Sequence, residues 1–287
     1  MFILLDVLLA CHNRRNTTAT CLKSLIDQKL PPNVKLRIIL VDDGSNDGTS
    51  EMVTDMFPDV FLVRGNGNLY WTGGMSLAMN VAGDQADYFL LLNDDTHLYP
   101  DAITNLIQSS NNLTGQGIKT PIIIGATESP DGSGLSYGGL HCNSKFNSLY
   151  LEKVIPQKSP VLCDTFNGNC VLFPVAAKIL IGGLDQNFTH SMGDIDLGLR
   201  AKKYGIKSYM SPGYVGTCIP NNGDGLWTDK TLPIAERWKQ IIGPKGLPPR
   251  EWFVMTRRYA GPFWPLFWVN PYLKFFLCFL KSKCSLE

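Results

Sequence analysis

The sequence lacks several features that would place it in a protein class at once. Its eight cysteines contain no CxxC pair, so the chain has neither the spacing of a zinc module nor the dense disulfide framework of a small secreted domain. Charge of one sign is missing too, because the formal net charge is +1 over 287 residues. That balance excludes a strongly basic surface for nucleic acid and an acidic tail. Any anionic ligand must therefore be held by a local site.

The opening of the sequence is not expected to be a hydrophobic leader. The apolar opening has no basic residue ahead of it, contains Asp6 and runs directly into polar residues 11–15, which is typical of a buried strand and not of a signal peptide. This pattern and the scattered cysteines predict reduced thiols and a cytoplasmic protein. The 44% hydrophobic and 18% charged residues are enough to build a globular core.

Strand and helix patterns alternate over the first hundred residues. Apolar runs of strand length are separated by segments whose apolar residues recur at helical spacing. This order predicts an α/β protein with a Rossmann-like, mostly parallel sheet and helices on both faces. The expected strands are 4–10, 35–41, 60–64 and 88–92, and the expected helices include 18–28 and 73–83.

Polar clusters follow three of these strands, at residues 11–14, 42–45 and 93–95. Ligands of open parallel sheets bind in the crevice outside the carboxyl ends of the strands. The three clusters, although far apart in the sequence, therefore predict one ligand site.

Two carboxylates, Asp94 and Asp95, end the last of these strands. Such oxygen ligands suit Mg²⁺ or Mn²⁺ bound jointly with a diphosphate, and turn formation is the structural alternative. Cys218 is a further candidate ligand, although a thiolate is soft for these ions. Asp43, in the second Asp-Asp pair, is a candidate to accept a hydrogen bond from a pyrimidine N3–H and so to read the base.

Four segments together carry a resemblance to a known family. They are Ala-Cys-His-Asn-Arg at 10–14, Val-Asp-Asp-Gly-Ser-Asn-Asp-Gly-Thr at 41–49, Asn-Asp-Asp at 93–95 and Gly-Asp-Ile-Asp-Leu-Gly-Leu-Arg at 193–200. In order and spacing they resemble the inverting family 2 glycosyltransferases of GT-A fold, over about residues 5–218. The resemblance implies that Asp95 is the main metal ligand and Asp194 the catalytic base. It also implies, with the basic loop after the first strand, a nucleotide-binding set of Ala10, Asn13, Arg14, Asp43, Gly73, Gly74 and Asp94.

The chemistry of sugar transfer independently requires a base such as Asp194. An acceptor hydroxyl is a poor nucleophile at neutral pH, so a carboxylate must take its proton as the new bond forms. Direct displacement opposite the diphosphate then inverts the anomeric centre. Asp196 is either a substrate ligand or simply a carboxylate at the start of a helix.

Three further residues are candidates for substrate contact. Trp71 is a candidate to stack on an apolar sugar face, Asn169 to bind sugar hydroxyls, and His190 to lie on the acceptor side. Packing within the core is the structural alternative for the tryptophan and the histidine.

The chain is expected to divide at about residue 225. Residues 1–114 form the nucleotide-binding half and 115–225 the acceptor-side half of a GT-A domain, and 226–287 form a C-terminal extension. The prolines of the extension make a spanning helix improbable. We expect instead a short helix from Pro271 whose aromatic face, with nearby lysines, contacts the inner face of the cytoplasmic membrane peripherally. The residues of that face are Tyr272, Phe275, Phe276, Phe279 and Leu280.

These patterns predict a metal-dependent glycosyltransferase that moves a sugar from a UDP- or dTDP-sugar to a saccharide or lipid-linked acceptor. Surface polysaccharide or glycolipid synthesis is the expected setting. A nucleotidyltransferase is the first alternative, but it would need a glycine-rich basic loop after the first strand, and residues 11–17 contain no glycine. A non-catalytic sugar-nucleotide module is the second alternative, and it would be expected to have lost Asp95 or Asp194.

Overall fold

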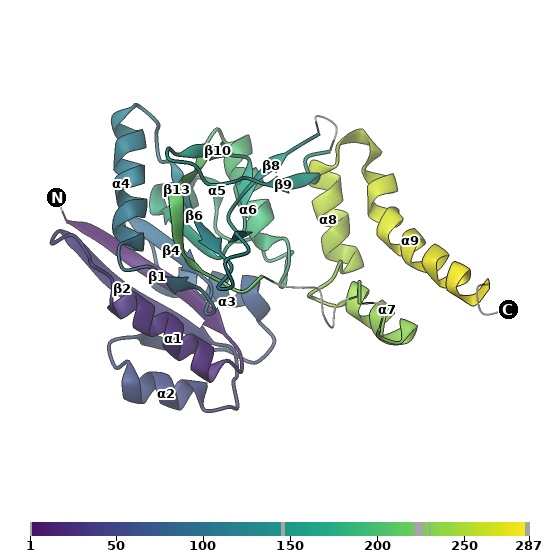
Figure 1. The fold of residues 1–287 in the computed structure, drawn as a ribbon, viewed down its shortest axis with the longest axis horizontal. Helices are drawn as coiled ribbons and strands as arrows, with labels where there is room; N and C mark the ends of the chain where they lie inside the picture. Colours follow the sequence, from purple (N-terminus) through teal and green to yellow (C-terminus); the bar gives the residue numbers. More distant parts are fainter. Residues whose placement is uncertain (1, 145–146, 221–226, 230, 285–287) are drawn as a thin grey trace.

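The computed structural model describes residues 2–144, 147–220, 227–229 and 231–284, with side chains as far as Leu277. Within these residues a ten-stranded sheet has the order β10-β13-β6-β12-β4-β1-β2-β3, with β5 paired to β13 and β7 to β6 (Figure 1). Its strands are β1 (Ile3–Cys11), β2 (Val34–Asp42), β3 (Phe61–Arg64), β4 (Tyr88–Leu92), β5 (His97–Leu98), β6 (Ile122–Glu128), β7 (Leu135–Tyr137), β10 (Val161–Cys163), β12 (Cys170–Pro174) and β13 (Ser208–Thr217).

The long strands of this sheet run mostly in one direction. β3, β2, β1 and β4 are mutually parallel, and β12 is inserted antiparallel between β4 and β6. β6 and β13 are parallel to each other and resume the first direction. The predicted mostly parallel sheet is therefore confirmed, with β12 as the reversed strand at its centre.

Helices cover both faces of the sheet, as predicted. Alternate residues of β1 point to opposite faces, so Leu5, Val7 and Leu9 enter one core cluster and Leu8 enters the other. The first cluster also contains residues of α1 (Arg15–Ile26), α2 (Thr49–Met56) and α4 (Ala102–Gly115). The second contains residues of α3 (Tyr70–Ala82), α5 (Val175–Ile181) and α6 (Gly193–Lys203).

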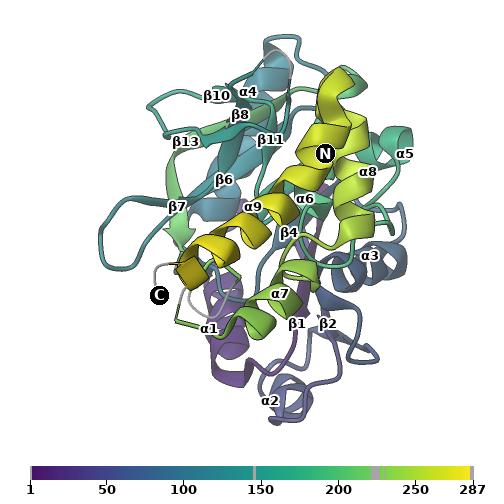
Figure 2. The ribbon, with the colours of Figure 1, turned by 90° about the vertical axis from the view of Figure 1, so that its right-hand side faces the viewer.

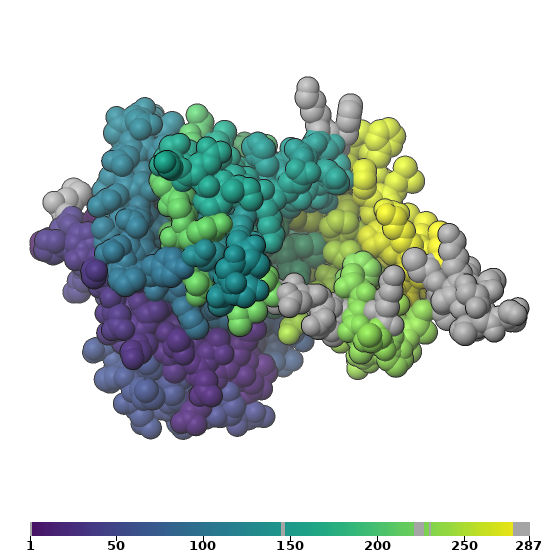
Figure 3. Space-filling model, in the orientation of Figure 1, coloured from purple at the N-terminus to yellow at the C-terminus, as the bar shows by residue number. Residues whose placement is uncertain are grey.

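A small second sheet and a group of C-terminal helices complete the structure. The small sheet has the order β11-β8-β9, formed by β8 (Gly139–Cys142), β9 (Leu151–Lys153) and β11 (Thr165–Phe166). The C-terminal elements are α7 (Ile234–Ile242), α8 (Pro249–Tyr259), the 3₁₀ turn η1 (Gly261–Phe263) and α9 (Trp264–Cys284). Figures 2 and 3 show that these helices lie together at one end of the molecule.

The C-terminal helices pack on the rest of the structure through α8. Met255 and Tyr259 of α8 form a buried cluster with Leu199 of α6 and with Phe188. α9 in turn packs on α7, where the Trp238 ring lies 5.4 Å from that of Phe275.

The structure corrects the predicted start of the last helix. α9 begins at Trp264 and runs through Pro271. Pro265 is tolerated because it lies in the first turn, where a backbone N–H has no helical partner. Pro271 is tolerated because an interior proline removes only one backbone hydrogen bond of a long helix. Among the described residues, no helix is both long enough and apolar enough to cross a bilayer.

The predicted aromatic face of that helix is also corrected. Tyr272 donates a hydrogen bond to the Leu247 carbonyl at 2.6 Å, and Phe275 is buried against Trp238, so these side chains hold α9 on its neighbours. The side chains of Phe279 and Leu280 lie outside the described residues.

Candidate active site

The three polar clusters meet at one edge of the sheet, as predicted. β1 pairs with β2 so that Cys11 lies opposite Asp42, and this brings the loops after the two strands together. Asn13 joins these loops: its backbone N–H donates to Ser45 Oγ at 2.8 Å, and its Oδ1 accepts the Asn46 N–H at 2.8 Å. The Asn13 side chain thus shapes the loops of the predicted nucleotide site.

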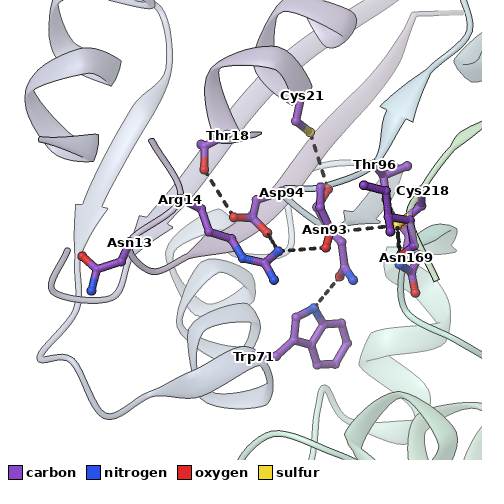
Figure 4. A network of polar contacts seen from close by, with 12 residues as sticks. Asn13, Arg14, Thr18, Cys21, Trp71, Asn93, Asp94, Thr96, Asn169 and Cys218 are labelled. Carbon is purple, nitrogen blue, oxygen red and sulfur yellow. Dashed lines mark hydrogen bonds and ion pairs between the residues drawn. The ribbon is translucent and has the colours of Figure 1, made fainter. Parts of the chain in front are cut away.

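Asp94 and Asp95 follow β4 at this edge and share one cationic partner, Arg14; Figure 4 shows Arg14 beside Asp94. Arg14 Nη1 is 3.0 Å from Asp94 Oδ1 and 2.8 Å from Asp95 Oδ2. Thr18 Oγ1 also donates to Asp94 at 3.3 Å. Burial raises the pKa of Asp94 to about 6, and the Arg14 charge opposes this rise only in part.

The Cys218 thiol completes the surroundings of Asp95. Its Sγ is 3.4 Å from Asp95 Oδ1 and 3.5 Å from Asn169 Nδ2. Burial raises the pKa of Cys218 to about 12, so in the metal-free site the group is a neutral thiol that donates to the carboxylate.

The donor set at this point suits a hard divalent ion. Within the described part of the chain no three His, Cys, Asp or Glu side chains are grouped to enclose a metal. Mg²⁺ and Mn²⁺ nonetheless need only one or two carboxylates when phosphates and water supply the other ligands. Asp94 and Asp95 therefore fit an ion that is held jointly with a diphosphate.

Asp194 lies at the N-terminal end of α6 with both carboxylate oxygens oriented by the backbone. Its Oδ2 accepts the Gly168 N–H at 2.9 Å and its Oδ1 accepts the Ile195 N–H at 2.8 Å. Burial raises the pKa of Asp194 above its ordinary value, and these backbone hydrogen bonds oppose the rise. A carboxylate with a raised pKa is a stronger proton acceptor.

Close packing explains the glycine that precedes this carboxylate. A Cβ on Gly193 would lie 2.5 Å from Thr72 Oγ1 of α3, so a larger residue has no room between the two helix starts. The same approach places Asp194 beside the segment that carries Trp71.

The Trp71 side chain connects Asp194 to the carboxylate pair. A Cβ on Gly168 would lie 2.4 Å from the Trp71 ring, which shows how closely the ring covers the amide that binds Asp194. On its other side Trp71 Nε1 donates to Asn93 Oδ1 at 2.7 Å (Figure 4). The indole therefore joins the two predicted chemical centres.

His190 lies beside the same tryptophan. Its Nδ1 accepts the Trp71 N–H at 3.4 Å, and burial lowers the pKa of His190 to about 4, with the charges of Lys245 and Arg14 acting in the same direction. The ring is therefore neutral at physiological pH and carries its proton on Nε2.

Asp43, the predicted reader of the base, is engaged by backbone N–H groups in this structure. The side chain is buried, and its oxygens accept backbone N–H groups of Gly67 at 2.8 Å, Leu69 at 2.8 Å and Tyr70 at 3.0 Å. In this structure the carboxylate holds the segment that enters α3, because that segment would otherwise leave three N–H groups without acceptors.

Gly73 and Gly74 have a packing role in this structure. They lie inside α3, and a Cβ on Gly74 would be 2.8 Å from the Ala10 Cβ while one on Gly73 would be 3.3 Å from the Leu69 Cβ. The absence of side chains at Gly74 and beyond the Cβ of Ala10 brings α3 close to β1.

The structure favours the structural alternative for Asp196. This side chain is fully buried, with Oδ2 2.6 Å from Arg200 Nε and Oδ1 2.8 Å from Arg258 Nη1. The Tyr259 hydroxyl donates to Oδ1 at 2.7 Å. We call Asp196, Arg200, Arg258 and Tyr259 the α6–α8 clamp. Asn169 is also buried, so neither side chain is presented to a sugar in this state.

The sequence analysis missed Thr18 and Gly168 as members of this site, and it placed Asn93 in a polar cluster without giving its side chain a role. Asn93 carries a visible signal, since it directly precedes the Asp-Asp pair. The others act through contacts with residues distant in the chain, which no local pattern marks.

Comparison with known proteins decides the family. The model of glycosyl transferase family 2 matches residues 6–169, which include the Asp-Asp pair and the Gly168 amide. The chain belongs to this family. The resemblance noted from its segments is thereby confirmed.

Two relatives indicate the range of the family. The N-acetylglucosaminyl-diphospho-decaprenol L-rhamnosyltransferase of Mycobacterium tuberculosis is 26% identical over 201 residues, which are 61% of this chain and 64% of the relative. The poly-beta-1,6-N-acetyl-D-glucosamine synthase of Staphylococcus epidermidis is 30% identical over 256 residues, 82% of this chain and 54% of the relative. The chain thus spans less than two thirds of the length of either relative.

Solved structures confirm the GT-A fold. S. aureus TarS in complex with UDP-GlcNAc matches with a TM-score of 0.56 at 11% identity, over 89% of this chain and 71% of that chain. The mannosyltransferase PcManGT from Pyrobaculum calidifontis, in complex with GDP-Man and Mn²⁺, matches with a TM-score of 0.53 at 17% identity, over 94% of this chain and 69% of that chain.

Proposed function

We propose that this chain transfers one sugar from a UDP- or dTDP-sugar to an acceptor hydroxyl with inversion, using a divalent ion, in surface polysaccharide or glycolipid synthesis. The observation that carries the proposal is the connection from Asp194 through Gly168, Trp71 and Asn93 to the Asp94–Asp95 pair. A proton acceptor and a carboxylate pair at one edge of the sheet are what displacement of a nucleoside diphosphate requires.

Asp194 acts on the acceptor. Its carboxylate takes the proton of the acceptor hydroxyl as the oxygen bonds to the anomeric carbon and the bond to the diphosphate breaks. The Gly168 and Ile195 N–H groups keep the carboxylate in one orientation during this transfer, and burial strengthens it as a base. The divalent ion, when bound by Asp95 and Asp94, offsets negative charge on the leaving diphosphate.

The relatives support the classes of substrate. TarS was solved with UDP-GlcNAc and PcManGT with GDP-Man and Mn²⁺, which supports a nucleoside diphosphate sugar and a divalent ion for this chain. The name of the mycobacterial relative describes a decaprenol-linked acceptor, which supports a lipid-linked acceptor here.

A direct test is the release of nucleoside diphosphate from a panel of UDP-, dTDP- and GDP-sugars in the presence of Mn²⁺. We expect turnover of a UDP- or dTDP-sugar, its loss on chelation, and a product of inverted anomeric configuration when an acceptor is supplied. No turnover of any donor, or a product that retains the donor configuration, would contradict the proposal.

The exposed side of the C-terminal helices supports a peripheral contact with a membrane. Its large apolar side chains are 51–65% exposed and lie on η1 and α9, with Lys274 on α9 and Arg257 at the end of α8. Apolar side chains flanked by basic ones are what binding to an anionic lipid surface needs. The apolar residues are Phe263, Leu266, Leu273 and Leu277.

Two charged double variants test this contact. Replacing Leu266 and Leu273 by Asp leaves the face that packs on Trp238 untouched, so we expect loss of flotation with anionic liposomes and unchanged donor hydrolysis. The matched control replaces Ile179 and Leu180 of α5, which are 65% and 58% exposed, and it should float normally. Equal flotation of the two variants, or none by the unchanged protein, would contradict the contact.

A further inference from the structure

A single nitrogen of Arg14 bridges both carboxylates of the Asp-Asp pair. Nη1 donates to Asp94 Oδ1 at 3.0 Å and to Asp95 Oδ2 at 2.8 Å. In the proposed function, these same two side chains bind the divalent ion. Among the described residues, the hydrogen bonds of this guanidinium all go to the two aspartates.

The carboxylate pair requires a cation in the absence of donor. Two neighbouring carboxylates repel each other, and Asp94 is buried, where an uncompensated charge is most costly. Thr18 and Cys218, the other groups that contact the pair, are neutral donors. Arg14 alone among these contacts supplies positive charge, and a guanidinium does not lose its proton in proteins.

Arg14 is also placed to change partners. Its side chain is 46% exposed, in contrast to the buried Asp94. It lines an open cavity of about 430 Å³ at the start of α1, together with Arg15 and Asn13. The planar guanidinium binds phosphate oxygens as well as it binds carboxylates, so a diphosphate entering from this side competes with the aspartates for it.

We infer that Arg14 and the divalent ion exclude each other at the Asp94–Asp95 pair, so that the ion binds together with the nucleotide and not before it. Arg14 neutralises the pair in the donor-free protein and turns to the diphosphate when the donor enters. The inference rests on the proposed function, because it takes a nucleoside diphosphate as the ligand. Arg14 is thus a positioning residue that couples the two binding events.

The test measures Mn²⁺ binding to the full chain by electron paramagnetic resonance of the free ion, without any sugar transfer. Without nucleotide, the unchanged protein should bind Mn²⁺ weakly. Arg14→Gln should bind it about tenfold more tightly, the scale expected when one charged hydrogen-bond partner ceases to compete. With UDP added, the affinity of the unchanged protein should rise strongly and that of Arg14→Gln should rise much less.

Two variants control for charge and folding. Arg15→Gln removes the same charge from the next position, which lines the same cavity, and it should leave donor-free Mn²⁺ binding unchanged. Arg14→Lys keeps the charge beside the aspartates, so its donor-free Mn²⁺ binding should remain as weak as that of the unchanged protein. This variant keeps the test valid even if thermal unfolding shows that Arg14→Gln is unstable.

Equal donor-free affinity in Arg14→Gln and Arg15→Gln, or tight Mn²⁺ binding by Arg14→Lys, would overturn the inference. Failure of the proposed function has a separate signature, which is the absence of turnover with every nucleotide sugar.

Discussion

Replacement of Asp194 by Asn separates proton acceptance from structure, and the backbone around it lets both effects be estimated. The amide cannot accept a proton from the acceptor hydroxyl, so the transfer rate should fall by about a hundredfold or more, the usual contribution of a general base. Nucleotide affinity should be unchanged, because the Asp194 carboxylate is held by the Gly168 and Ile195 amides, whereas the loops of the predicted nucleotide site are held by Asn13 and Ser45.

The same change also has a structural cost that the hydrogen bonds reveal. Both oxygens of Asp194 accept backbone N–H groups, one from Gly168 and one from Ile195. An Asn side chain has one oxygen, so either rotamer turns its NH₂ group toward a backbone N–H. One amide is then left without an acceptor, which lowers the free energy of unfolding by about 1–3 kcal/mol.

Rates should therefore be measured well below the melting temperature of Asp194→Asn, together with UDP affinity and thermal unfolding of both proteins. We expect a much lower kcat, unchanged UDP binding and a lower melting temperature. A kcat close to that of the unchanged protein would refute the assignment of the base. A kcat recovered on cooling would show that the loss came from instability alone.

Three further outcomes follow from the site. Asp95→Ala should abolish transfer and Mn²⁺-dependent UDP binding, and activity that persists in excess chelator would contradict the metal assignment. Burial raises the pKa of Asp194, and only the deprotonated base is active. As the pH is lowered, kcat should therefore fall with a midpoint above about 3.9, the ordinary pKa of Asp. A midpoint at or below that value would contradict the raised pKa of the base. Asp196→Ala should lower the free energy of unfolding in urea by about 2–3 kcal/mol, since it removes the salt-bridge partner of the largely buried Arg200 and leaves Arg258 with Asp185 alone, and an unchanged urea midpoint would show that the clamp is not stabilising.

The sheet could be predicted because its signals are local. Runs such as residues 88–92 are apolar throughout and end in charged or polar residues, so strand and strand end are visible in one short window. The shared edge then follows from the rule for parallel strands. The reversed direction of β12 could not be predicted, because the sequence of a buried five-residue strand does not indicate which strands it pairs with or in which direction it runs.

The partners of individual carboxylates could not be predicted for a related reason. Arg14 and Asp94 are 80 positions apart, and Asp43 meets the amide of Leu69 26 positions later. An Asp at a strand end looks the same in sequence whether it faces a ligand or a backbone N–H. In this structure Asp43 accepts hydrogen bonds from the segment entering α3, whose backbone N–H groups have no other acceptor within the helix.

The α6–α8 clamp determines where this chain can be shortened. Asp196 lies two residues after Asp194 on α6, and its charge is balanced in part by Arg258 of α8. A protease cut or an engineered stop near residue 225 would remove Arg258 and Tyr259 and leave the carboxylate at the start of the base-bearing helix with Arg200 alone. A stop after Gly261 would keep the clamp and remove the rest of η1 together with α9. Fragments that retain residue 259 should therefore resist digestion together with the catalytic body, and shorter ones should be degraded.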